Sequence, residues 1–145
     1  MKALLQRVSE AEVSVAGTRI AGIGRGLLVF VGFERADAAA ELQWLVDKVL
    51  EIRVFPDTAN AMNRSLRDID GELLVVSQFT LAADTSRGRR PGFSTAAPPD
   101  QAEGLYARLV EQFRAQWPRV QTGRFGADMQ VGLVNDGPVT FLLER

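Results

Sequence analysis

The chain has 145 residues, of which 46% are hydrophobic and 24% are charged, and its formal net charge is −1. This composition is typical of one ordinary globular domain and argues against intrinsic disorder, collagen and disulfide-rich scaffolds. Cysteine and histidine are both absent, which excludes thiol nucleophiles, Ser–His–Asp triads and zinc sites built from thiolate or imidazole. An enzyme with this composition must work with hydroxyls, carboxylates, amides, backbone groups or atoms of its substrate.

No segment predicts insertion into a membrane. The longest apolar run, Gly26–Phe33, is far shorter than the roughly 20 residues that a transmembrane helix needs. Gln6 and Arg7 interrupt the apolar stretch at the start of the sequence, so we do not expect a signal peptide. These features predict a cytoplasmic protein with no membrane partner.

The first third of the chain predicts short strands. Lys2–Val8, Val13–Val15 and Arg19–Ile23 carry strand-forming residues with turn residues between them. The segment Gly26–Gly32 is a continuous apolar run, which is typical of a strand covered on both faces.

The hydrophobic period then changes to that of a helix, from about Asp37 to Ile52. Asp37 is suited to cap its N-terminus. A short strand is expected at Arg53–Phe55, ended by Pro56, and an irregular stretch over residues 57–70. The apolar residues at helical spacing are Leu42, Leu45, Val46, Val49 and Leu50.

The second half predicts one more buried strand, ending near Gln78, and a long loop over residues 83–99. Loops of this length without structure of their own are often functional. Asp100 and Glu103 resemble a capping box at the start of a second helix, and Pro118 ends that helix. The expected apolar stripe comprises Leu105, Leu109, Val110, Phe113 and Trp117.

Two further strands, Asp128–Val134 and Val139–Leu143, are expected around the sequence NDGP. Strands therefore outnumber helices, and at least two helices cover one side. We expect a single mixed α/β domain over residues 1–145, a layered β/β/α sandwich with barrel-like sheets and helices on one side.

The sequence Ser77–Leu81 places polar residues at the end of a buried strand. Such residues often line a site, because the strand holds them rigidly. Taken alone, a strand that runs out into solvent is the simpler interpretation. A hydroxyl without a histidine is a poor nucleophile, whereas backbone N–H groups in a turn here could form an oxyanion hole.

The sequence Asn135–Thr140 (NDGPVT) is rich in turn residues, and a hairpin turn is its simplest interpretation. Proline after glycine is nevertheless unusual in a plain hairpin. A cis Gly137–Pro138 bond would present two carbonyl groups side by side, and such a pair could bind an ammonium group.

Two weaker patterns remain. Arg87, Arg89 and Arg90 could hold phosphates, although a solvated loop explains them as well. Phe125 and Met129 could hold a nucleobase between them, although ordinary core packing is the simpler interpretation of that spacing.

Taken together, in their order and spacing, these segments resemble the D-aminoacyl-tRNA deacylase family. The resemblance runs over essentially the whole chain. Neither SQFTL nor NDGPVT is specific alone, but both in one chain of this length are specific. The matching segments are LLQRVSEAEVSV, MNRSLRDIDGELLVVSQFTL, GRRPGF and TGRFGADMQVGLVNDGPVTF.

The resemblance implies a homodimer, with active sites at the subunit interface, that hydrolyses the ester joining a D-amino acid to the 3′-terminal adenosine of tRNA. It also implies removal of glycine from mischarged tRNA. We expect neither a metal nor another cofactor. The partners expected are D-aminoacyl-tRNA, glycyl-tRNA and a second copy of the chain.

By motif, Gly137 and Pro138 would enter the partner's active site as a cis dipeptide. Their carbonyls would meet the amino group of the substrate and leave no room for an L side chain, whereas glycine would pass. Arg7 and Asn135 would support this dipeptide from behind.

The same resemblance implies the remaining site residues. Ser77, Gln78, Phe79 and Thr80 would line the catalytic pocket. The backbone N–H groups near Phe79 and Thr80 would form the oxyanion hole. Phe125 and Met129 would contact the terminal adenine.

The absence of histidine fits a reaction in which the 2′-hydroxyl of the adenosine assists the attack of water or the transfer of a proton. Thr80 as a covalent nucleophile is the competing mechanism, although no base for it is obvious. Two other functions stay open: a dimeric RNA-binding module without catalysis, and a hydrolase of other small acyl esters.

Overall fold

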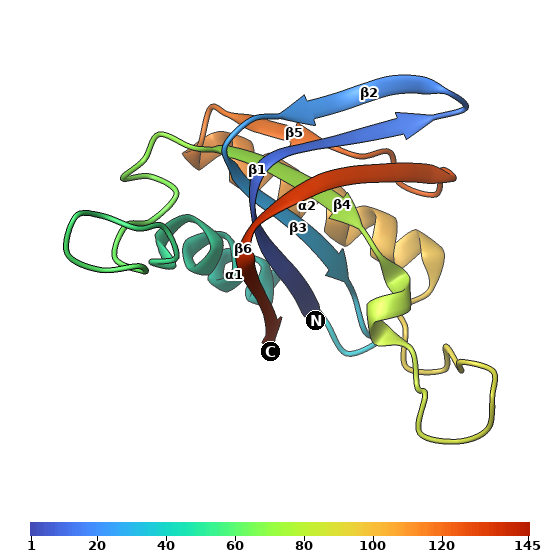
Figure 1. Ribbon diagram of the computed structural model, residues 1–145. Coiled ribbons are helices and arrows are strands. Elements are labelled where there is room, and N and C mark those ends of the chain that lie inside the picture. Colours follow the sequence, from blue (N-terminus) through green and yellow to red (C-terminus); the bar gives the residue numbers. More distant parts are fainter.

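A curled sheet of six strands is the centre of the fold, and the computed structural model describes all 145 residues. The strands follow the order β2-β1-β3-β4-β5, and β6 pairs with β1. Two α-helices lie on the same side of this sheet (Figure 1). The elements are β1 (Lys2–Val15), β2 (Thr18–Ile23), β3 (Gly26–Gly32), α1 (Ala39–Glu51), β4 (Glu72–Ser77), the 3₁₀ helix η1 (Phe79–Ala82), α2 (Pro99–Gln116), β5 (Val120–Thr122) and β6 (Met129–Glu144).

The long strand β1 bends the sheet. Its Lys2–Val8 part pairs with β3, its Ala11–Val15 part pairs with β2, and β6 accompanies it along almost its whole length. The register with β6 shifts between these two parts, as at a β-bulge, which bends a strand. The second half of β1, with β2, therefore folds over the face of β3 and β4.

This bend produces two hydrophobic cores. The larger one lies between the helices and one face of β3 and β4, and the smaller one lies between the opposite face and the folded-over part of the sheet. Successive residues of β3 alternate between them, since Leu27 and Val29 belong to the larger core and Leu28 to the smaller. The prediction of a strand covered on both faces is confirmed, and so is the layered α/β fold with a barrel-like sheet.

Several predicted boundaries are wrong. Lys2–Val8 and Val13–Val15 are one strand, and the two predicted C-terminal strands are also one. Arg53–Phe55 forms no strand, because Phe55 makes only an isolated bridge with Arg64. No sequence pattern predicted β5 or η1, which have three and four residues.

Both predicted helix caps are also wrong. At α1, the Asp37 carboxylate instead accepts hydrogen bonds from the Met1 amino group and the Glu34 N–H, both at 2.7 Å. The helix begins after Ala38, whose N–H donates to the Glu41 carboxylate at 2.9 Å. At α2 no side chain caps the helix, which begins with Pro99, a residue suited to the first helical position because it has no N–H to satisfy.

None of the helices combines the length and the apolar character that a membrane span requires.

The loop after η1 extends away from the body of the molecule (Figure 1).

Candidate functional site

A pocket of about 430 Å³ lies at the carboxyl end of β4. Five of the residues predicted from the sequence line it together: Ser77, Gln78, Phe79, Phe125 and Met129. The rest of the lining is largely apolar, which suits a flat ring such as a nucleobase better than a free ion. The other lining residues are Val76, Ala97, Pro99, Ala102, Gly126, Ala127, Asp128 and Val131.

Two backbone donors stand free where β4 passes into η1. The Gln78 N–H donates to the Val31 carbonyl at 2.7 Å, and the Leu81 N–H closes the 3₁₀ turn onto the Gln78 carbonyl at 3.2 Å. The N–H groups of Phe79 and Thr80 are the first two of η1 and so have no partner within its 3₁₀ turn, and neither donates to a turn, a loop or a side chain. The first N–H groups of a helix lack partners within the helix, and adjacent free donors can stabilise a developing oxyanion.

The Thr80 hydroxyl has one side-chain partner, the amide of Gln78, at 2.5 Å from Nε2 to Oγ1. An amide is not basic enough to remove a hydroxyl proton, and no carboxylate or amine is bonded to this hydroxyl. The nucleophile–base pair that activates serine or threonine in covalent catalysis is therefore missing. Thr80 lies beside the pocket without lining it.

Tyr106 supports the wall of the pocket from behind, and no sequence motif had indicated it. Its buried hydroxyl donates to the Val75 carbonyl at 2.8 Å, and its ring lies 6.0 Å from the ring of Phe125. Burial raises the pKa of Tyr106 above its ordinary value, so the hydroxyl keeps its proton. Tyr106 is one of the buried residues of α2, so its spacing alone does not distinguish it from a core residue.

The wall that carries Met129 is held by a sulfur contact. The Arg124 N–H donates to the Met129 sulfur at 3.3 Å. A side chain at Gly123 would bring a Cβ within 2.8 Å of the same sulfur. The turn between β5 and β6 therefore packs closely around this methionine.

The Gly137–Pro138 peptide bond is cis. Gln6 lies opposite Thr140 and Val8 opposite Asn135, so residues 136–139 bulge out of the ladder. Both residues of the dipeptide are exposed, and neither lines the pocket of its own chain.

Asn135 and Arg7 hold this bulge. The Asn135 amide donates to the Val139 carbonyl at 3.1 Å, and its Oδ1 accepts the Val139 N–H at 3.0 Å. Arg7 donates from Nε to the Asp136 carbonyl at 2.7 Å and also forms an ion pair with the Asp136 carboxylate at 3.4 Å. Arg7 and Asn135 are the two residues for which the family resemblance implies support of the dipeptide.

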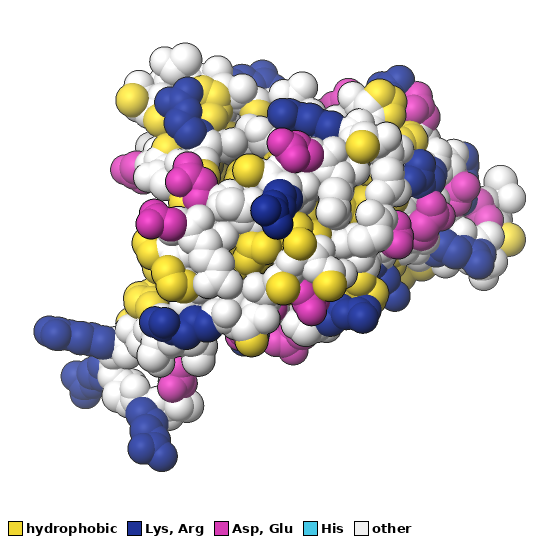
Figure 2. All heavy atoms as spheres, turned by 180° about the vertical axis from the view of Figure 1, so that it is seen from behind, with side chains coloured by type: hydrophobic (Ala, Val, Ile, Leu, Met, Phe, Trp, Pro, Cys, Tyr) yellow, Lys and Arg dark blue, Asp and Glu magenta, His cyan; other side chains and the backbone are white.

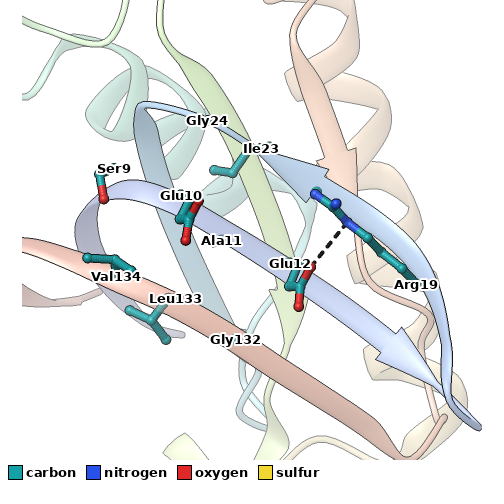
Figure 3. A pocket seen from close by; sticks show the side chains of 11 residues that line it. Ser9, Glu10, Ala11, Glu12, Arg19, Ile23, Gly24, Gly132, Leu133 and Val134 are labelled. Atoms are coloured by element: carbon teal, nitrogen blue, oxygen red, sulfur yellow. Dashed lines mark ion pairs between the residues drawn. The ribbon is translucent and has the colours of Figure 1, made fainter.

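A second hollow, of about 500 Å³, lies on the outer face of β1, β2 and β6 (Figure 3). Its polar side chains include Glu10, Glu12 and Arg19, and Arg19 is engaged with Glu12 at 3.3 Å. It contains none of the residues that the motifs indicated. No group of three or more acidic side chains is placed to hold a metal ion.

Comparison with known proteins agrees with this geometry. The family described as D-Tyr-tRNA(Tyr) deacylase matches residues 4–144. A relative named D-aminoacyl-tRNA deacylase, from Ectopseudomonas mendocina (strain ymp), is 61% identical and covers 99% of both chains. Another of that name, from Geobacter sulfurreducens, is 51% identical and covers 99% of this chain and 95% of its own.

Two solved structures share the fold. One, described as c-Myc DNA Unwinding Element Binding Protein, has a TM-score of 0.95 at 44% identity and covers 100% of this chain and 99% of its own. The other, described as a probable eukaryotic D-amino acid tRNA deacylase, has a TM-score of 0.87 at 20% identity, with 98% and 97% covered. These matches define the chain as an enzyme of the hydrolase class. It belongs to the D-Tyr-tRNA(Tyr) deacylase family.

Proposed function

We propose that the protein hydrolyses the ester bond of D-aminoacyl-tRNA in the cytoplasm and releases the free D-amino acid and tRNA. The observation that carries this proposal is the pocket at the end of β4. It combines a largely apolar wall, with Phe125 and Met129, and two free backbone donors at Phe79 and Thr80. The wall suits the terminal adenine, and the donors suit the oxyanion that forms when water adds to the ester carbonyl.

The 2′-hydroxyl of the substrate is proposed to take the place of the catalytic base that the protein lacks. In the proposed reaction water attacks the ester carbonyl, the bond from that carbon to the 3′-oxygen breaks, and the 3′-oxygen takes up a proton. The neighbouring 2′-hydroxyl of the adenosine assists the proton transfer. The missing base at Thr80 and the absence of histidine support this mechanism over covalent catalysis.

Chirality is proposed to be selected by Gly137 and Pro138 of a second copy of the chain. Both residues are exposed and lie outside the pocket of their own chain, so they would have to act on another subunit. There their carbonyls would bind the amino group of the substrate and exclude an L side chain. Glycine has no side chain to exclude, so glycyl-tRNA would also be hydrolysed.

The first test is deacylation of matched D-tyrosyl-, L-tyrosyl- and glycyl-tRNA by the purified protein with a chelator present. We expect rapid release of D-tyrosine and glycine, with L-tyrosine spared. Release of all three would contradict the role of Gly137 and Pro138. Salt-dependent binding of tRNA without any release would favour the RNA-binding module, and sedimentation of the same sample measures whether it is a dimer.

The second test replaces the terminal adenosine of D-tyrosyl-tRNA with 2′-deoxyadenosine. The modified substrate should bind normally and be cleaved very slowly, because the assisting hydroxyl is missing. Cleavage at the normal rate would contradict assistance by the 2′-hydroxyl and would favour Thr80 as a covalent nucleophile.

A further inference from the structure

The loop after η1 is a closed hairpin at the rim of the pocket. Asp84 and Gly92 exchange two backbone hydrogen bonds, each of 2.8 Å. The Asp84 carboxylate accepts the Ser86 N–H at 2.9 Å, and hydrogen bonding from Ser86 lowers the pKa of Asp84. Gly88, with a φ of +73°, lies in the turn at the tip. We call residues 84–92 the basic hairpin.

Three arginines of the basic hairpin have no partner. Arg87, Arg89 and Arg90 are all exposed, and none of them forms an ion pair or donates a side-chain hydrogen bond within the chain. Figure 2 shows Lys and Arg side chains spread around the protruding loop at its lower left. The only acidic residue of the hairpin is Asp84, whose carboxylate is engaged at its base.

Charge is therefore separated within the molecule. Three arginines and one aspartate give the basic hairpin a formal charge of +2, and because the whole chain carries −1, the remaining residues carry −3. The near-neutral total conceals a local cationic site. Free guanidinium groups in such a cluster match phosphate oxygens in geometry and charge.

The base of the basic hairpin is attached to the pocket. The rings of Phe79 and Phe93 lie 5.0 Å apart, and Phe79 also lines the pocket. The chain that leaves the hairpin is held by Arg35, whose Nε donates to the Ser94 carbonyl at 2.6 Å, and it reaches Ala97, another lining residue. Phe79 and Phe93 expose 58% and 38% of their surface, so aromatic faces lie between the pocket and the arginines.

We propose that the basic hairpin, with Phe93 at its base, binds the unpaired nucleotides that precede the terminal adenosine of tRNA. This inference rests on the proposed function, which places that adenosine in the pocket. The four residue-to-residue steps from Asp84 to Gly88 can span up to about 14 Å, which is long enough for the arginines to meet the phosphates next to the terminal nucleotide. Aromatic rings next to a positively charged surface are usual in proteins that bind single-stranded nucleic acid.

The test compares a substrate that has the nucleotides before the terminal adenosine with one that lacks them: D-tyrosyl-tRNA and the D-tyrosyl ester of adenosine. The variant is the triple substitution Arg87→Ala, Arg89→Ala, Arg90→Ala. On tRNA we expect KM to rise at least about tenfold, and the slope of log KM against log salt to fall by about 2 for three lost contacts to a single strand. kcat on tRNA and both constants on the adenosine ester should be unchanged.

The matched control removes three other positive charges, with Lys48→Ala, Arg108→Ala and Arg114→Ala. These residues are exposed on α1 and α2, and their loss should leave the salt slope on tRNA nearly unchanged. The triple substitution Arg87→Lys, Arg89→Lys, Arg90→Lys should keep the wild-type salt slope, but its KM should lie between those of the wild type and the alanine variant, because an ammonium cannot bind phosphate through two parallel hydrogen bonds. An equal effect of the control, or an equal loss on both substrates, would overturn the inference.

A direct measurement separates this inference from the proposed function. If the wild-type protein cleaves neither substrate, the proposed function fails, and the Kd for uncharged tRNA still tests the hairpin. A weaker, less salt-dependent Kd in the triple arginine variant alone would support the basic hairpin as an RNA-binding surface. Equal Kd values in all variants would refute it.

Discussion

Arg7 donates a hydrogen bond to the carbonyl of Asp136 at 2.7 Å, directly before the exposed Gly137–Pro138 dipeptide. The same guanidinium donates from Nη1 to the Val54 carbonyl at 2.6 Å. Its side chain is only 12% exposed. One side chain therefore fixes the position of the bulge relative to the segment that follows α1.

Arg7→Lys should weaken both stability and chiral selection. Lysine keeps the positive charge, but its single ammonium group cannot replace the two separate guanidinium donors that bind the Asp136 and Val54 carbonyls. We expect about 1–3 kcal/mol less stability in urea unfolding and a smaller ratio of D- to L-tyrosyl-tRNA hydrolysis. The matched control is Arg19→Lys, at an exposed ion pair, which should change neither the stability nor the ratio of D- to L-tyrosyl-tRNA hydrolysis. If Arg7→Lys left that ratio unchanged, Arg7 would have no role in chiral selection.

Gly137→Ala should be far more damaging than its size suggests. The new Cβ would lie 2.0 Å from the Val139 nitrogen and 2.7 Å from the Asn135 Oδ1, so the bulge must move. A displacement of about 1 Å at a reacting centre costs roughly 100-fold in rate, and we expect a loss of that order in D-tyrosyl-tRNA hydrolysis. Gly104→Ala, where a Cβ meets nothing within 4 Å, should stay fully active and gain about 0.5–1 kcal/mol of stability.

Thr80→Ala should keep its rate within about tenfold of the wild type. The hydroxyl has an amide as its side-chain partner and supplies no base, whereas the backbone N–H survives the substitution. Loss of a covalent nucleophile would instead cost about 10⁴-fold or more in kcat. Single-turnover rates on D-tyrosyl-tRNA decide between the two, and a loss of the larger size would establish Thr80 as the nucleophile.

Tyr106 should resist ionisation in the folded protein. Burial raises the pKa of this hydroxyl, and because it is the only tyrosine, tyrosinate absorbance reports on it alone. The unfolded chain releases this proton near pH 10, so the contribution of Tyr106 to stability is complete below that pH and declines as the pH rises further.

Comparison with Tyr106→Phe isolates this contribution. The variant should be about 1 kcal/mol less stable at neutral pH, since it loses the hydrogen bond to Val75. The difference from the wild type should shrink above pH 10. Ionisation of native Tyr106 near pH 10 would show that the hydroxyl is not shielded as described.

The sequence predicted elements well where one hydrophobic period persisted. Gly26–Gly32 and the apolar stripe of α1 are correct because burial dictates their residues directly. The polar residues Ser9 and Glu10 suggested that a strand ended there, whereas β1 bends at this point and continues along β6. The pairing of β1 with β6 joins segments far apart in the sequence, so no local sequence pattern predicts it. For the same reason the sequence did not predict that β6 is one continuous strand.

The site was predicted through its motifs rather than through local patterns. Ser77, Phe125 and Met129 meet in one pocket although 48 residues separate the first two, and only the resemblance connected them in advance. The unpaired donors at Phe79 and Thr80 depend on the 3₁₀ turn, whose four residues have no period to detect. Tyr106 was not predicted, because its hydrogen bond to the Val75 carbonyl leaves the apolar pattern of the helix unchanged.

The donors at positions 79 and 80 belong to the main chain, so the proposed oxyanion hole does not depend on which side chains stand there. Any amino acid except proline supplies the same N–H, and the proposed chemistry is therefore encoded in the path of the backbone. That path depends on residues such as Gly32, where a Cβ would lie 2.6 Å from the Gln78 carbonyl. In a saturation library, many side chains should therefore survive at position 80, while proline there and alanine at position 32 should be lost.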